Sequence, residues 1–95
     1  MTAAIEIVRL RITGQVQGVG YRFWMTRTAA SLGLRGWVRN RTDGSVEALV
    51  TGPPEAVAAM VEASREGPYE ARVTDVTVSP DRDDGSVGFT ARPTE

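Results

Sequence analysis

Residues 14–24, GQVQGVGYRFW, lie where the sequence changes from one hydrophobic period to another. Before this stretch, Val8, Leu10 and Ile12 alternate with polar residues, which predicts a strand with one apolar face. After it, apolar residues recur every three or four positions, which predicts a helix that ends near Gly33. The apolar stripe of this helix consists of Tyr21, Met25, Ala29 and Leu32. The glycine-rich stretch is therefore predicted to be a loop between a strand and a helix.

The remaining sequence predicts a hairpin, a second helix and two further strands. The expected strands are residues 35–42, 45–51, 71–79 and 86–92, and the expected helix is residues 53–66. An Asp-Gly pair at 43–44 is a strong signal for the hairpin turn. In the third of these strands the apolar parity shifts at Asp75, which predicts a β-bulge. The last strand is expected at an edge of the sheet, followed by a frayed tail at 93–95.

These elements follow the order β-α-β-β-α-β, with one additional β-stretch near the end. Two right-handed β-α-β crossovers place both helices on the same face of the sheet. The predicted fold class is therefore α+β: a ferredoxin-like two-layer sandwich with an antiparallel sheet and two helices on one face. Ninety-five residues suffice for a single core, and residues 1–95 are predicted to form one domain.

The composition excludes several kinds of catalyst, because the chain contains no histidine, no cysteine and no lysine. Without histidine and cysteine there is no phosphohistidine, no Ser–His or Cys–His nucleophile and no zinc site of the usual kinds. Magnesium or calcium bound by carboxylates stays open on composition alone. The nearest approach to such a site, DRDDGS at residues 81–86, has too few ligands and is predicted to be a solvated turn.

Charge and hydropathy point to a protein outside the membrane with an anionic ligand. The sequence has no apolar stretch of about 20 residues and no signal peptide, which predicts a cytoplasmic protein without a membrane segment. The net charge is −1, but residues 1–47 contain seven arginines and three acidic residues, whereas residues 48–95 contain four arginines and nine acidic residues. The basic half contains the glycine-rich loop, which favours an anion there.

The loop and the arginine after it have the features of a phosphate site. Gly18 and Gly20 allow the backbone N–H groups to converge on an anion at the start of the helix. Arg22 lies in the first helical turn, where a positive charge opposes the helix dipole, so a purely structural role does not explain it. The alternative is a strand-to-helix turn that simply needs glycines, and spacing alone leaves both interpretations open.

Asn40 is the second candidate residue. It shares its strand face with Val38, which indicates that its amide points towards the helices, where it is suited to hold a water molecule. Alternatively, Asn40 shapes the turn that leads into the Asp-Gly pair, as asparagine often does.

Two long motifs in this sequence resemble the acylphosphatase family. They are ITGQVQGVGYR at residues 12–22 and GWVRNRTDGSVEALVTG at residues 36–52, and the similarity extends over nearly the whole chain. The resemblance implies a ferredoxin-like sandwich that hydrolyses the carboxyl-phosphate bond of acyl phosphates. One departure from the family pattern is Tyr21, which stands where phenylalanine is usual; its hydroxyl needs a partner if it is buried.

The resemblance also implies roles for individual residues. Arg22 binds the phosphate, and Asn40 positions the attacking water. The backbone N–H groups of the loop cradle the phosphate; the loop residues are Gln17, Gly18, Val19, Gly20 and Tyr21. The family uses no metal, no cofactor and no covalent enzyme intermediate. The expected partners are a small-molecule acyl phosphate and phosphate or another anion in the loop, without nucleic acid or membrane, and the protein is expected to be a monomer.

Three alternatives to this interpretation have weaker support in the sequence. RGWV at 35–38 resembles an RNA-recognition strand, but the sequence pI of about 5.4 and the single aromatic residue of that strand, Trp37, argue against RNA binding. A domain of a larger carbamoyl-transfer protein is disfavoured because the chain ends at Glu95. An inactive scaffold is disfavoured by the presence of both Arg22 and Asn40. Nothing in the sequence identifies the acyl group; the only candidates to contact it are Phe23 and Trp24.

Overall fold

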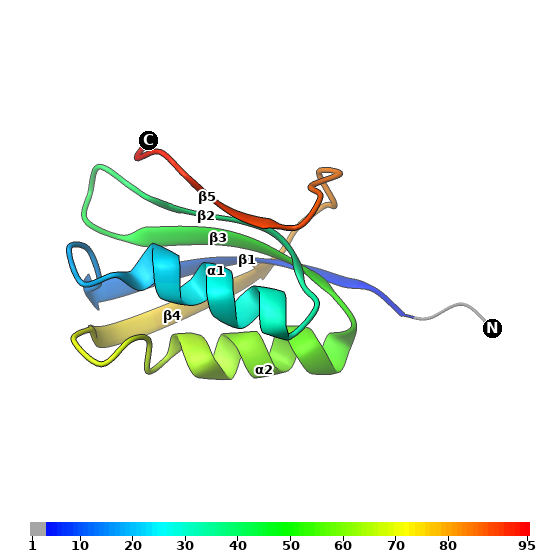
Figure 1. The fold of residues 1–95 in the computed structure, drawn as a ribbon, viewed down its shortest axis with the longest axis horizontal. Helices are drawn as coiled ribbons and strands as arrows, with labels where there is room; N and C mark the ends of the chain where they lie inside the picture. The colour runs from blue at the N-terminus through cyan, green and yellow to red at the C-terminus, as the bar shows by residue number, and fades with distance from the viewer. Residues whose placement is uncertain (1–3) are drawn as a thin grey trace.

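The computed structural model describes residues 4–95, which form five strands and two helices. The strands are β1 (Glu6–Gln15), β2 (Arg35–Asn40), β3 (Val46–Gly52), β4 (Arg72–Pro80) and β5 (Phe89–Arg92), and the helices are α1 (Tyr21–Ser31) and α2 (Pro54–Ser64). Both helices cover one face of the sheet and leave the other face open (Figure 1). The predicted two-layer α+β sandwich is therefore confirmed.

The sheet is mixed, because its fifth strand runs parallel to its neighbour. The strand order is β4-β1-β3-β2-β5, in which β1 to β4 pair antiparallel and β5 pairs parallel with β2. The chain leaves β4 at one edge of the sheet and turns back into β5 at the other, so β5 runs opposite to β4 and in the same direction as β2. The expectation of an antiparallel sheet thus holds for four strands, and β5 occupies the predicted edge. Val87, expected within this strand, precedes it and is exposed.

A β-bulge lies next to the position that the sequence indicated. Thr13 pairs with Asp75 but Gly14 pairs with Val73, so Thr74 is the additional residue of β4. Gly14 has a φ of +121°, and a Cβ added there would lie 2.2 Å from the carbonyl oxygen of Arg72. Only glycine fits this position, because both the backbone conformation and the close approach of β4 exclude a side chain.

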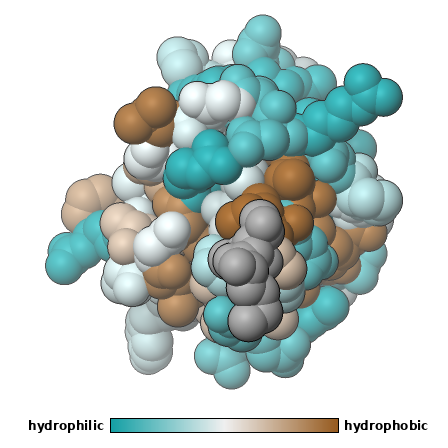
Figure 2. Space-filling model, turned by 90° about the vertical axis from the view of Figure 1, so that its right-hand side faces the viewer, coloured by the Kyte–Doolittle hydropathy of each residue, from teal (hydrophilic) through white to brown (hydrophobic). Residues whose placement is uncertain are grey.

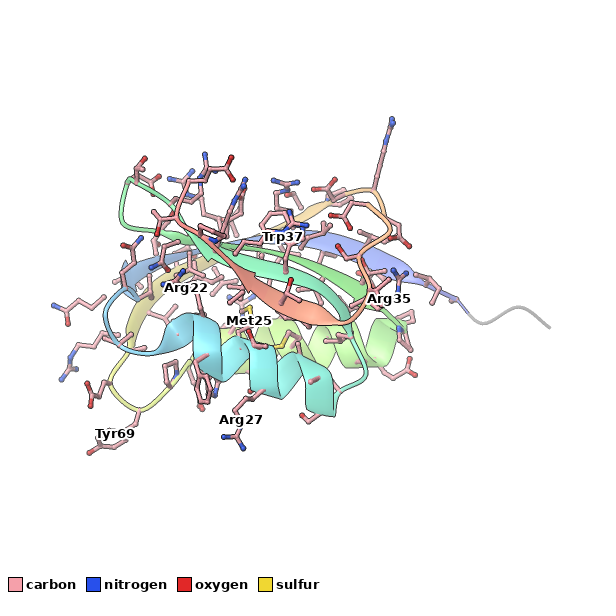
Figure 3. All side chains as sticks on the ribbon, turned by 45° about the horizontal axis from the view of Figure 1, so that its top comes forward. Arg22, Met25, Arg27, Arg35, Trp37 and Tyr69 are labelled. Carbon is pink, nitrogen blue, oxygen red and sulfur yellow. The ribbon has the colours of Figure 1, made fainter. Side chains whose placement is uncertain are left out.

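The core lies between the helices and the sheet, as the helical stripes predicted. Tyr21, Met25 and Ala29 of α1 are buried, and Figure 3 places Met25 between helix and sheet. The Tyr21 hydroxyl donates a hydrogen bond of 2.7 Å to the carbonyl oxygen of Ser64, which is the partner that burial of this hydroxyl required. Burial raises the pKa of Tyr21 to about 12. Its ring lies so close to Gly67 that a Cβ there would be 2.6 Å from a ring carbon.

The open face of the sheet is covered by arginines and carboxylates around a buried tryptophan. Trp37 is 3 % exposed, and its ring nitrogen donates to Asp84 at 2.9 Å. The guanidinium groups of Arg9, Arg39 and Arg92 lie 5.6, 4.8 and 4.7 Å from the centre of its ring. These distances are typical of cation–π contacts.

The carboxylates on this face bind the arginines. Glu47 accepts hydrogen bonds from Arg9 at 2.9 Å and from Arg39 at 2.8 Å. Asp83, in the connection between β4 and β5, pairs with Arg35 at 2.6 Å. The predicted turn at 81–86 is therefore more than a solvated turn, because its carboxylates hold the arginines and the tryptophan of the open face.

No helix within residues 4–95 is both long and apolar enough to span a lipid bilayer. Figure 2 faces the end of the molecule opposite the glycine-rich loop, and there the apolar areas are divided by polar ones.

Candidate active site

A hollow of about 390 Å³ opens at the end of the molecule where the glycine-rich loop precedes α1. Figure 1 shows that the β2–β3 hairpin turn and the chain after β5 lie at this same end. Residues from both sequence motifs and from β5 line the hollow: Val16, Gly18, Gly20, Tyr21, Arg22, Phe23, Thr26, Asn40 and Ala91. The structure thus brings Arg22 and Asn40 to one site with three residues of the predicted phosphate loop.

The loop leaves its backbone donors unoccupied. Gly18 and Gly20 have φ values of +74° and +80°, which glycine adopts without strain. Gly20 precedes the first turn of α1, which contains no acidic residue and has no side-chain cap. Within the described residues 4–95, no backbone N–H group of residues 17–23 donates to another group of the protein. These groups are available to an anion at the positive end of the helix dipole.

Arg22 points from the first turn of α1 towards the ends of the strands (Figure 3). Its Nη1 donates to the carbonyl oxygen of Arg92 at 3.1 Å. In the described part of the chain, no carboxylate lies within ion-pairing distance of its guanidinium. A guanidinium has five N–H donors, so four remain for a ligand.

Asn40 ends β2, and its backbone is held on both sides. It pairs with Val46 of β3, and its carbonyl oxygen accepts a hydrogen bond of 3.1 Å from the backbone N–H of Glu95. The carboxylate of Glu95 also pairs with Arg39. The expectation of a frayed tail at 93–95 is therefore wrong, because Glu95 is fixed beside the site. Asn40 lines the hollow, and its side-chain amide forms no hydrogen bond to another residue between residues 4 and 95.

Gln17 and Val19 do not line the hollow. Val19 packs against the core. The side-chain amide of Gln17 donates to two carbonyl oxygens of the hairpin turn, that of Arg41 at 2.8 Å and that of Ser45 at 2.9 Å. Gln17 therefore links the loop to the turn that follows Asn40. From the sequence, only the backbone N–H group of Gln17 is expected at the site, and this side-chain contact is not predicted.

Four further contributors to the site were not predicted, and one of them is Val16, a core residue just before the predicted loop. Thr26 lies one helical turn after Arg22, and this spacing could have indicated it. Ala91 and the carbonyl of Arg92 reach the site through the parallel pairing of β5, and no local pattern signals that pairing. Among residues 4–95, no group of three or more acidic side chains is arranged to hold a metal ion.

A family model, several relatives in sequence and two similar structures share the description acylphosphatase. The acylphosphatase family model matches residues 8–91. The chain is 54% identical to the acylphosphatase of Rhodospirillum rubrum over 94% of this chain and 98% of that protein. The acylphosphatase structure from Bacillus subtilis superposes with a TM-score of 0.88 at 38% identity, over 94% of this chain and 99% of the other.

A larger protein contains the same fold. Full-length HypF, in its phosphate- and nucleotide-bound form, aligns with a TM-score of 0.90 at 22% identity, over 99% of this chain but 13% of HypF. At this identity the likeness shows the fold alone. The two sequence motifs lie within the range that the family model covers, and the near-complete match to relatives of the same length extends beyond them. The chain therefore belongs to the acylphosphatase family, hydrolases that cleave the carboxyl-phosphate bond of acyl phosphates.

Proposed function

We propose that this chain hydrolyses acyl phosphates by binding the phosphoryl group between Arg22 and the loop and by orienting water with Asn40. The loop contributes the backbone N–H groups of residues 17–21. One observation carries the proposal: Arg22, Asn40, Gly18 and Gly20 line the same hollow although they come from two separate motifs.

Binding of the phosphoryl group follows from the free donors of the site. The backbone N–H groups of residues 17–23 have no partner in the described chain, and the first turn of α1 contains no acidic residue to neutralise its positive end. Arg22 adds a planar guanidinium that can bind two phosphoryl oxygens at once. These groups stabilise the charge on the phosphoryl oxygens as the transition state forms.

Hydrolysis then requires a water molecule in line with the bond that breaks. The Asn40 amide faces the hollow from the end of β2 and holds this water against the phosphorus. The water oxygen bonds to phosphorus while the bond from phosphorus to the carboxylate oxygen breaks, and the electron pair leaves with the carboxylate. One water proton passes to a phosphoryl oxygen, so the products are a carboxylate and inorganic phosphate.

The proposed reaction uses no metal, no cofactor and no covalent enzyme intermediate. The lining residues include no carboxylate, histidine or cysteine, so the hollow lacks the usual metal ligands and nucleophiles. A carboxylate leaves readily without a general acid, so positioning and charge stabilisation suffice.

RNA binding, the alternative suggested by the sequence RGWV at residues 35–38, has weaker support. Trp37 lies beneath three guanidinium groups and is 3 % exposed, so its ring is not available to stack on a base. The arginines beside it are paired with Glu47 and Asp84 rather than free for phosphates. We further propose a monomeric cytoplasmic protein in which residues 1–95 form one domain; gel filtration of the purified chain tests the oligomeric state.

The first test is hydrolysis of benzoyl phosphate by the purified chain with and without EDTA, beside Arg22→Ala and Asn40→Ala. Arg65→Ala is the matched control, because Arg65 lies after α2, away from the hollow. We expect the chain and the control to be active in EDTA and both site variants to lose at least about a hundredfold in kcat. Full activity of either site variant would refute its assigned role, and loss of activity in EDTA would refute the metal-free mechanism.

A further inference from the structure

The hollow offers more room and more apolar surface than a phosphate needs. Its volume of about 390 Å³ lies in the range of sites that hold a whole small molecule. Gly18, Gly20, Arg22 and Asn40 provide its polar groups. The remaining wall includes the apolar side chains of Val16, Phe23 and Ala91. An acyl phosphate bound through its phosphoryl group therefore has an apolar wall beside its acyl group.

Phe23 is the large side chain of this wall that is not part of the core. It follows Arg22 directly, it is 67% exposed, and it lines both this hollow and a second one of about 370 Å³ on the outer side of α1. An exposed aromatic ring beside an active site is a typical mark of a ligand contact.

The structure distinguishes Phe23 from Trp24, the other sequence candidate for contacting the acyl group. Trp24 packs edge-on against Tyr21, with ring centres 5.2 Å apart, and it lines only the second hollow. The Trp24 ring therefore packs on the flank of the core, whereas the Phe23 ring borders the phosphate site itself.

The Phe23 ring is supported from its outer side. The guanidinium of Arg27, one turn further along α1, lies 5.6 Å from the centre of this ring, a distance typical of a cation–π contact. Figure 3 shows Arg27 pointing away from the sheet, on the side of α1 opposite the core. Within residues 4–95, Arg27 forms no ion pair, so its contact with Phe23 is not in competition with a carboxylate.

We propose that Phe23 forms a subsite for the acyl group and makes the enzyme prefer aromatic acyl phosphates to small aliphatic ones. This inference rests on the proposed function, because it requires the phosphoryl group to occupy the loop. An aromatic acyl group packs its ring against Phe23, whereas an acetyl group is too small to cover that surface. Stacking of two rings is worth about a twofold to tenfold difference in affinity beyond the area that they bury.

The test compares kcat and KM for benzoyl phosphate and acetyl phosphate in the unmodified chain, Phe23→Leu and Phe23→Ala. Tyr69→Ala is the matched control, because Tyr69 is fully exposed and lies in a loop that does not line the hollow. We expect Phe23→Ala to lower the ratio of the two kcat/KM values about tenfold, mainly by raising KM for benzoyl phosphate. Phe23→Leu gives an intermediate ratio, and the control leaves it unchanged.

A second measurement separates failure of this inference from failure of the proposed function. Competitive displacement of inorganic phosphate by benzylphosphonate and by methylphosphonate reports binding without turnover. If neither acyl phosphate is hydrolysed, the proposed function fails, and the phosphonate ratio still decides the role of Phe23. A ratio that changes less than twofold in Phe23→Ala, or an equal loss for both ligands, would overturn the subsite.

Discussion

The arginines on the open face of the sheet and the arginine at the glycine-rich loop meet opposite surroundings. On the open face, Arg9 and Arg39 lie over Trp37 and share Glu47 as a partner. At the loop, the guanidinium of Arg22 has a single backbone carbonyl as its hydrogen-bond partner in residues 4–95. Both regions belong to one small chain with a net charge of −1. The difference shows that the number of arginines does not decide their role. Arginines paired with carboxylates stabilise the fold, whereas an arginine without such a partner is available to a ligand.

The first prediction sets Arg22→Ala against Arg9→Ala. Arg22 touches no carboxylate, so its loss is expected to lower kcat/KM about a thousandfold and to change the free energy of unfolding by less than about 0.5 kcal/mol. Arg9 bridges Glu47 and Asp81 and lies over Trp37, so its loss is expected to destabilise the fold by about 1 kcal/mol and leave kcat/KM within twofold. Steady-state kinetics and urea unfolding of both variants test this. If Arg22→Ala and Arg9→Ala had equal effects on kcat/KM and equal effects on the free energy of unfolding, the two regions would not differ in role.

The second prediction concerns Glu47. Burial alone would raise the pKa of Glu47, but hydrogen bonds from Arg39 and Arg9 outweigh burial and hold this pKa below its usual range. A carboxylate with a lowered pKa in the folded state adds stability above its unfolded pKa of about 4.3, and this stability is lost as the pH falls through the folded pKa. Glu47→Gln is therefore expected to cost about 2 kcal/mol at pH 7 and much less at pH 3.

Urea unfolding at pH 7, 5 and 3 measures this difference. Glu70→Gln is the control, because Glu70 is exposed and forms no ion pair in the described chain. A cost of Glu47→Gln that is the same at all three pH values would show that its ionisation does not stabilise the open face.

The third prediction concerns the link between the two motifs. Gln17→Met keeps the length of the side chain but removes both hydrogen bonds to the hairpin turn after Asn40. Because the turn loses its fixed distance from the loop, we expect kcat to fall about tenfold while the Kd for inorganic phosphate changes less than threefold. Gln15→Met is the control, since Gln15 is exposed at the end of β1. An equal loss in phosphate affinity would place Gln17 in phosphate binding instead.

The smallest effect is expected at the core tyrosine. The Tyr21 pKa of about 12 in the folded state lies above its ordinary value of about 10, so its stabilisation is complete below pH 10 and is lost as the pH rises towards 12. Tyr21→Phe is expected to cost about 1 kcal/mol at pH 7 and to flatten the loss of stability between pH 10 and 11.5. Thermal unfolding across this range tests it, with Tyr69→Phe as the exposed control. If Tyr21→Phe loses as much stability over this pH range as the unmodified chain, a group other than Tyr21 causes that loss.

The sequence predicted most of the fold because its signals are local. The alternation of Val8, Leu10 and Ile12, the stripe that begins at Tyr21 and the Asp-Gly turn each depend on a few neighbouring residues. Even the bulge was visible as a change of parity near Asp75, one residue from Thr74. The face of the sheet that the helices cover and the positions of both helices follow from these signals.

The features that the sequence did not predict depend on contacts between distant parts of the chain. The direction of β5, the binding of Asp83 to Arg35 and the hydrogen bond from Glu95 to Asn40 all join the region after β4 to β2. A carboxylate in a polar loop has the same local appearance whether it is solvated or paired. At the site, Arg22 was indicated by its conflict with the helix dipole, whereas the contact of Gln17 with the turn has no local signature.

The parallel pairing of β5 with β2 also bears on the order in which the protein assembles. The hollow needs Ala91 and the carbonyl of Arg92, and Trp37 needs Asp84 and Arg92 above it. Strands β1 to β4 pair with one another without β5, which lies at an edge of the sheet and adds Phe89 to the core. Closing so long a segment onto β2 is a slow kind of step in folding. We therefore expect a chain emerging from the ribosome to complete its site only when β5 docks, because Ala91 and the carbonyl of Arg92 belong to that strand.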